Sequence, residues 1–169
     1  MRRLLRVALL ALAVAVATHY AAVVALPYLS MQLAMRAISF GGERVNSWLH
    51  ARPVTPDSRR VVRPAPEFAY SSCVYDLSRQ PLRIHVAAWP AYWSLSLYAA
   101  NTDNFLTMGD RDHPEGVELV LVQGDQAAGT VHSPSTRGIA LIRRLVTDAD
   151  GWSAVDAARK DDVCAPLTP

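Results

Sequence analysis

The hydrophobic positions along this chain follow two patterns, one continuous and one alternating, which predict two kinds of structure. From Val7 to Leu29 almost every residue is apolar, and Thr18 and His19 are the only strongly polar interruptions. A helix of about 23 residues rises roughly 35 Å, which is enough to cross a hydrocarbon core of about 30 Å. We therefore expect this segment to be a transmembrane helix.

The charges beside the apolar segment predict its orientation. Three arginines lie within the first six residues, and a positively charged flank is normally retained in the cytoplasm. Beyond the segment, only Arg36 and Arg44 lie within the roughly 15–20 residues over which this rule has most force. We expect residues 1–29 to form a short cytoplasmic tail and an anchor in a bacterial inner membrane, with the lipid bilayer as its partner and the rest of the chain in the periplasm.

A cleaved signal peptide is the competing interpretation of the same segment. Val7–Val16 would then be its hydrophobic region, and the small residues around Ala17 would form the cleavage site of a secreted protein. The apolar sequence resumes at 21–26, where a secreted domain normally begins with polar residues, and this favours the retained anchor. Both interpretations export the C-terminal domain. A buried helix of a soluble protein would need a larger core than this chain offers.

Residues 30–67 combine helical and extended patterns. Met31–Leu49 has apolar residues at helical spacing, interrupted by Gly41 and Gly42, which predicts a continued or second juxtamembrane helix lying along the membrane surface. Four prolines mixed with arginine and serine follow between 53 and 66, and this composition is typical of an extended linker.

Residues 68–169 change to an alternation of period two. Leu82, Ile84 and Val86 would lie on one face of a strand and the intervening polar residues on the other. After Gly151, the spacing of Ser153 and Asp156 predicts the start of a short helix over 154–160. The expected fold is mainly β: an antiparallel β-sandwich or barrel-like domain with a short C-terminal helix. Other strands are expected at Tyr70–Leu77, Tyr92–Tyr98, Val117–Val122, Thr130–His132 and Ile139–Val146.

Two cysteines, Cys73 and Cys164, lie near the two ends of this exported domain. In an oxidising compartment they are candidates for a disulfide, although two buried thiols would fit the sequence equally well. No Cys or His spacing of a zinc site is present, so we expect no metal there. The net charge of +2 is too small to indicate a nucleic-acid partner.

The densest polar cluster follows the aromatic run at Tyr92–Tyr98. Asparagine and aspartate at these positions are typical of tight turns, because their side chains bond their own backbone. The same oxygens could instead converge on a polar ligand or a cation, beside an aromatic wall. Neither a catalytic residue nor a cofactor can be assigned from the sequence. The candidate ligand-binding residues are Tyr92, Trp93, Asn101, Asp103, Asn104, Asp110 and Arg111.

Three stretches together resemble the bacterial domain of unknown function family 1254: Tyr70–Leu82, Tyr92–Phe105 and Ser133–Gly138. The resemblance covers about Val61 to Leu167 and implies a β-rich domain of exported or envelope proteins, with no catalytic residues to transfer. In longer members the resemblance implies a second β-rich domain, which we do not expect in this chain. We therefore expect that a separate membrane-anchored protein supplies the second domain.

These observations favour a single-pass inner-membrane protein whose periplasmic β-domain binds a partner or an envelope ligand. An envelope hydrolase or lyase is the alternative, in which Asp103 and Asp110 act as acid and base or as cation ligands and Arg111 holds an anion. A purely structural spacer is a third interpretation.

Overall fold

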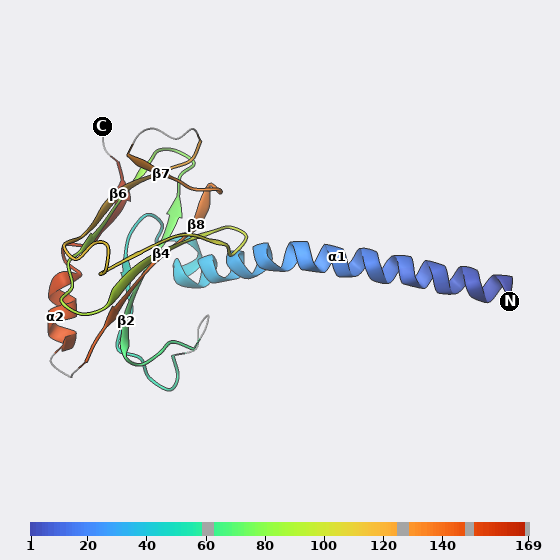
Figure 1. The fold of residues 1–169 in the computed structure, drawn as a ribbon, viewed down its shortest axis with the longest axis horizontal. Coiled ribbons are helices and arrows are strands. Elements are labelled where there is room, and N and C mark those ends of the chain that lie inside the picture. The colour runs from blue at the N-terminus through green and yellow to red at the C-terminus, as the bar shows by residue number, and fades with distance from the viewer. Residues whose placement is uncertain (59–62, 125–128, 148–150, 168–169) are drawn as a thin grey trace.

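The structure is a computed structural model that describes residues 1–58, 63–124, 129–147 and 151–167. Two β-sheets pack face to face, and a long N-terminal helix projects away from one of them (Figure 1). This sandwich-like arrangement agrees with the predicted mainly-β fold. The helices are α1 (Arg2–Ile38), a 3-10 turn η1 (Phe40–Gly42) and α2 (Gly151–Ala158). The strands are β1 (Leu49–His50), β2 (Phe68–Asp76), β3 (Leu82–Ala87), β4 (Trp93–Ala99), β5 (Asn104–Gly109), β6 (Gly116–Val122), β7 (Thr130–His132), β8 (Arg137–Leu145) and β9 (Val163–Pro166).

The five-stranded sheet has the order β1-β2-β8-β4-β5, and the four-stranded sheet has the order β7-β6-β3-β9. Neighbouring strands are antiparallel except for β6 and β7, which are parallel. The register of β2 on β8 runs from Phe68 opposite Leu145 to Asp76 opposite Arg137. Because side chains alternate between faces, this register sends one set of residues into the sandwich and leaves the other set outside.

The core lies between the two sheets and follows the predicted alternation. Leu82, Ile84 and Val86 of β3 are fully buried, as expected for one face of that strand. They pack against the inner face of the five-stranded sheet, where Trp93 and Leu95 are also fully buried. Burial of apolar surface at about 25 cal/mol per Å² is the main stabilising term for such a core.

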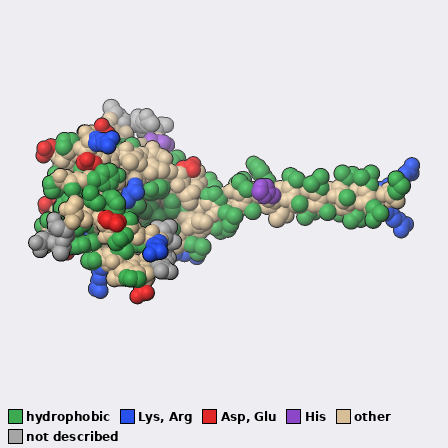
Figure 2. Space-filling model, turned by 60° about the horizontal axis from the view of Figure 1, so that its bottom comes forward, with side chains coloured by type: hydrophobic (Ala, Val, Ile, Leu, Met, Phe, Trp, Pro, Cys, Tyr) green, Lys and Arg blue, Asp and Glu red, His purple; other side chains and the backbone are tan. Residues whose placement is uncertain are grey.

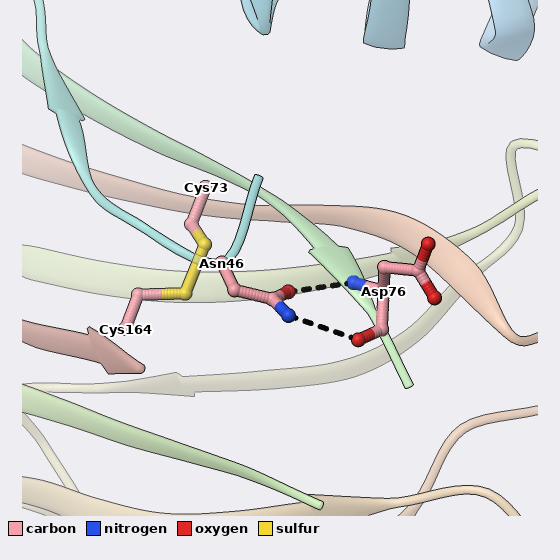
Figure 3. Close-up of a disulfide and its surroundings, with 4 residues drawn as sticks. All are labelled: Asn46, Cys73, Asp76 and Cys164. Carbon is pink, nitrogen blue, oxygen red and sulfur yellow. Dashed lines mark hydrogen bonds between the residues drawn. A yellow bond between two sulfur atoms is a disulfide. The ribbon is translucent and has the colours of Figure 1, made fainter. Parts of the chain in front are cut away.

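A disulfide joins the two sheets. Cys73 of β2 bonds to Cys164 of β9, with 6.7 Å between their Cα atoms (Figure 3). The candidate disulfide of the sequence is therefore present, and the alternative of two free thiols is excluded. The cysteines are 91 residues apart, so in the chain-entropy model the bond stabilises the fold by about 4–5 kcal/mol.

A buried ion pair makes a second link between the sheets. Arg144 of β8 donates two hydrogen bonds of 2.7 Å to the carboxylate of Asp162, just before β9. The main chain of Ala87, at the end of β3, binds both partners: its N–H donates to Asp162 and its carbonyl accepts from Arg144. The exposed fractions of the two side chains are 1% and 0%. This geometry satisfies most of the hydrogen-bonding capacity of two charges that would be costly to bury unpaired.

The helix α1 extends beyond the apolar segment, as the continued-helix alternative predicted. It is continuous from that segment through Pro27 to Ile38, where Ser39 caps it by donating to the carbonyl of Met35. The continuation therefore ends well before Leu49, and there is no separate second α-helix between Ser39 and Leu49. The last turns of α1 pack on the five-stranded sheet, and the helix ends before the positive φ angles at Phe40 and Gly41.

Residues upstream of the predicted boundary at Phe68 also contribute to the sheet. Asn46 holds the end of β2 through both backbone groups of Asp76: its side-chain oxygen accepts from the N–H, and its amide donates to the carbonyl (Figure 3). β1 then pairs with Ser71 and Ser72 of β2. This part of the predicted linker thus forms an edge of the fold.

Besides β1, two strands and one helix boundary differ from the sequence prediction. β5 and β9 were not expected from the alternation. α2 begins at Gly151, so Ser153 lies inside the helix and is not its N-terminal cap. Asp156 instead forms an ion pair with Arg159, whose guanidinium also donates to backbone carbonyls of Ala51 and Tyr70.

Candidate functional site on the outer face of the five-stranded sheet

The outer face of the five-stranded sheet is the surface from which α1 projects, and α2 lies on the opposite side of the sandwich (Figure 1). The strand register arranges its side chains in rows that cross β2, β8 and β4. One end of this face is covered by α1. The other end is half-exposed, so the face has two regions with different surroundings.

The covered end consists of Val74, Ile139 and Tyr98, one from each of the three strands. Met31 and Met35 of α1 pack on this row and are about 5% exposed. Methionine is suited to such contacts because its flexible thioether fills irregular gaps. The row therefore fixes the C-terminal part of α1 to the sheet.

The half-exposed end is aromatic. Phe68 of β2 lies opposite Leu145 of β8. Tyr92, just before β4, lies on the other side of Leu145, and its backbone carbonyl accepts a hydrogen bond from the Leu145 N–H. The rings of Phe68 and Tyr92 are 5.9 Å apart and approximately perpendicular, and Tyr92 is 45% exposed. We call Phe68, Leu145 and Tyr92 the aromatic row. Half-exposed aromatic side chains of this kind are enriched in protein interfaces.

Of the two rows between these ends, the one next to the aromatic row carries polar groups in an unusually buried setting. Tyr70, Arg143 and Ser94 lie opposite one another on β2, β8 and β4. Arg143 donates to the hydroxyl of Ser96 at 3.4 Å, a long hydrogen bond. Among the described residues, Arg143 Nε and Ser94 Oγ are buried without a hydrogen-bond partner. Such groups are rare in folded proteins, because leaving them unpaired costs about 1–3 kcal/mol each.

The structure places Asn101 and Asp103 in the turn between β4 and β5, and Asn104 at the start of β5. The side-chain amide of Asn101 donates to the Asp103 carboxylate at 2.5 Å, and the Asp103 N–H donates back to Asn101 at 3.3 Å. Asn104 accepts from the Thr107 hydroxyl, and Thr102 has a left-handed φ of 73°. These oxygens therefore stabilise a tight turn, as the structural interpretation of the sequence predicted.

The other candidate residues lie at the opposite end of the same hairpin. Asp110 and Arg111 follow β5, and the Asp110 N–H donates to the carbonyl of Trp93 at the start of β4. The Trp93 side chain points into the core and is fully buried, so it cannot form a wall for a ligand beside Tyr92. The six residues of β5 separate the two groups by about 20 Å.

The candidate residues are therefore not brought together in one site. The hydrolase or lyase alternative requires Asp103 and Asp110 to converge, and the strand register keeps them at the two ends of β5. Within the described ranges, no group of three or more His, Cys, Asp or Glu side chains is arranged to hold a metal ion.

Ser133–Gly138 has a structural role at one end of the five-stranded sheet. The Ser135 hydroxyl accepts from the Ala100 N–H at 2.9 Å, which ties this segment to the end of β4. The buried hydroxyl of Tyr75 donates to the Tyr98 carbonyl and contacts Ser133. Burial raises the pKa of this phenol, against the opposing effect of its serine partners. Gly138 is required here, because a Cβ would overlap the Tyr75 hydroxyl and the Tyr98 carbonyl.

Residues 45–166 match the family described as "Protein of unknown function (DUF1254)". The chain belongs to this family. The match confirms the resemblance found in the sequence, and its start at residue 45 agrees with the contribution of Asn46 and β1 to the sheet. No curated protein matches the chain.

The solved structures that match this chain include proteins from two organisms. The VPA0106 protein from Vibrio parahaemolyticus has 10% sequence identity and a TM-score of 0.62, over 83% of this chain and 35% of that one. An uncharacterized protein from Burkholderia cenocepacia has 14% identity and a TM-score of 0.47, over 62% of this chain and 32% of that one. The likeness to the Vibrio parahaemolyticus protein supports the sandwich-like fold. This DUF1254 chain spans about a third of the length of both proteins.

The sequence identified Tyr92 but missed its neighbours Phe68 and Leu145, together with Arg143 in the next row. A detectable signal did exist, since Tyr70, Leu141, Arg143 and Leu145 each alternate with an inward-facing residue. Alternation alone, however, does not say which of two apolar faces points outward.

Proposed function

We propose that this DUF1254 protein is a single-pass inner-membrane protein whose periplasmic β-domain works by binding a partner protein. The observation that carries the proposal is α1: none of its most apolar 18-residue window is buried in the fold. Figure 2 shows apolar side chains around α1 along its length and basic side chains at its free end. A helix that is apolar on all sides needs a covering from outside the chain, and a bilayer provides one.

The disulfide supports export of the β-domain. Bonds of this kind persist in the periplasm and outside the cell, and they are rare in the cytoplasm. The arginines that precede the apolar segment support an orientation with the N-terminus in the cytoplasm. An anchored protein in this orientation exposes Cys73 and Cys164 to the oxidising side.

The proposed partner is a separate membrane-anchored protein that carries a companion β-rich domain. Its support is that the Vibrio parahaemolyticus protein, which shares this fold, is much longer than the shared part, since the matched region covers 35% of its length. The aromatic row and the neighbouring Arg143 are the proposed contact, because aromatic residues and arginine supply most of the binding energy in protein interfaces.

Site-specific photo-crosslinking in intact cells tests this proposal. A photoreactive amino acid at Tyr92 is expected to capture a defined membrane protein with a second β-rich domain. The same amino acid at Glu118, which is exposed on the four-stranded sheet, is the matched control and should not capture it. Tyr92→Ala should weaken co-purification of that protein in mild detergent, while Glu118→Ala should not. Failure of the Tyr92 probe to capture any protein beyond the level of the Glu118 probe would contradict the proposal.

A further inference from the structure

We propose that the β-domain is held directly on the bilayer surface, with the β4–β5 turn (Ala100–Asp103) at the level of the lipid headgroups. This inference rests on the proposed role of α1 as a membrane anchor. It adds that the anchor and domain move as one body, so that a specific end of the sandwich always faces the lipid.

The apolar segment joins the fold without a spacer. The segment ends at Leu29, and Met31 is already buried against the sheet. Two residues of helix rise only about 3 Å. The headgroup layer on each side of a bilayer is roughly 5–8 Å thick, from the difference between its total and hydrocarbon thickness. The contact between Met31 and the sheet therefore lies within the headgroup layer.

The connection between the apolar segment and the β-domain is rigid. Met31, Ala34, Met35 and Ile38 recur at the spacing of one helix face, and this face packs on the sheet. α1 is unbroken between the apolar segment and this contact. No flexible segment separates them, so the direction of α1 sets the direction of the domain.

The β4–β5 turn is the part of the domain that would face the lipid. Tyr98 packs in the same cluster as Met31 and Met35, and it pairs with Asn104 at the start of β5. The turn that joins these strands therefore lies beside α1. Figure 1 shows this connection between β4 and β5 extending along α1 in the direction of its N-terminus. The polar side chains of Asn101, Thr102 and Asp103 suit the hydrated headgroup layer.

Lipid-dependent fluorescence quenching tests the proposal in the full-length chain. Both native cysteines are bonded to each other, so a single new cysteine can be labelled selectively. Thr102→Cys places the label at the exposed tip of the turn, and Arg111→Cys places it at the exposed far end of the same hairpin. The proteins are reconstituted in nanodiscs of phosphatidylethanolamine and phosphatidylglycerol, with a short-range nitroxide quencher on a fraction of the headgroups.

Quenching at position 102 is expected to be several-fold stronger than at position 111. The variant Met31→Ser with Met35→Ser should reduce the quenching at 102 towards that at 111, because it removes the contact that orients the domain. Equal quenching at the two positions, with the chain resistant to alkaline extraction, would overturn the docking while leaving the anchor intact. Release of the chain by alkaline extraction would overturn both.

Discussion

The two faces of the five-stranded sheet differ in how they are closed. The inner face is sealed by the opposite sheet, the Cys73–Cys164 disulfide and the buried Arg144–Asp162 pair. The outer face is covered at one end by α1, and its aromatic row is half-exposed at the other end. The difference indicates that the inner face determines stability, and in our proposal the outer face carries the attachments to membrane and partner. Changes on the two faces should therefore have separable effects.

The largest expected effect is loss of the disulfide on the inner face. Cys73→Ala with Cys164→Ala should lower the free energy of unfolding by about 4–5 kcal/mol, because the unfolded chain regains the entropy of a long loop. Urea unfolding of the variant and of the oxidised wild type measures this difference. A reductant should destabilise the wild type and leave the double variant unchanged. Equal stability of the oxidised and reduced wild type would show that this bond does not lock the inner face.

Breaking the buried ion pair is expected to have a slightly smaller effect. Arg144→Met leaves the Asp162 carboxylate buried without its bidentate partner and should cost about 3–5 kcal/mol. Combining it with Asp162→Leu removes the stranded charge, so the double variant should be more stable than Arg144→Met alone. Urea unfolding of both variants provides the comparison. A double variant less stable than the single variant would mean that packing, and not charge, dominates at this position.

A change at the covered end of the outer face should act locally. Met35→Ala removes a buried side chain from the contact between α1 and the sheet, at a cost of about 2 kcal/mol. Amide hydrogen exchange in the last turns of α1 should accelerate at least roughly tenfold, while exchange in β3 and β6 stays unchanged. Leu33→Ala is the control, since Leu33 is 66% exposed on the same part of the helix. Faster exchange throughout the sandwich would contradict the separation of the two faces.

The smallest expected effect is the pH dependence of an outer-face ion pair. Burial raises the pKa of Asp76, but hydrogen bonds from Ser78 and Arg137 outweigh it and hold the pKa below its ordinary value of 3.8. This carboxylate therefore stabilises the fold above about pH 3.8, and the contribution is lost as the pH falls through the lowered pKa. Thermal unfolding between neutral and acidic pH should show a shallower acid-side decline for Asp76→Asn than for the wild type. Identical pH profiles would exclude a contribution from Asp76.

Much of the fold could be predicted from the sequence, because apolar alternation at residues such as Leu82, Ile84 and Val86 follows directly from burial of one strand face. β5 escaped detection because it is an edge strand with a register shift opposite Leu97 and Tyr98, which disturbs the alternation. β9 is short and ends in Pro166, a residue that usually argues against a strand. The helical spacing after Met31 predicted that the helix continues, but the packing of Met31 and Met35 on the sheet is a tertiary contact that no local pattern reveals.

The candidate site was harder to predict than the fold. Asn101 and Asp110 are close in sequence, but an intervening strand separates them, and proximity along the chain therefore suggested convergence that the hairpin prevents. Aromatic residues at alternating positions could equally belong to a core, and Trp93 and Tyr92 show both outcomes in adjacent positions. The aromatic row also depends on Phe68, which is brought beside Tyr92 only by the pairing of β2 and β4 with β8.

The most direct test of the account is the fate of the N-terminal segment in cells that express the full chain. Membranes are washed at alkaline pH, and the N-terminal residues of the protein are determined in the pellet and in the wash. The account predicts that the protein stays in the pellet with residues 1–17 still attached. A protein found in the wash that begins just after Ala17 would show a cleaved signal peptide and would contradict the anchored, lipid-facing domain.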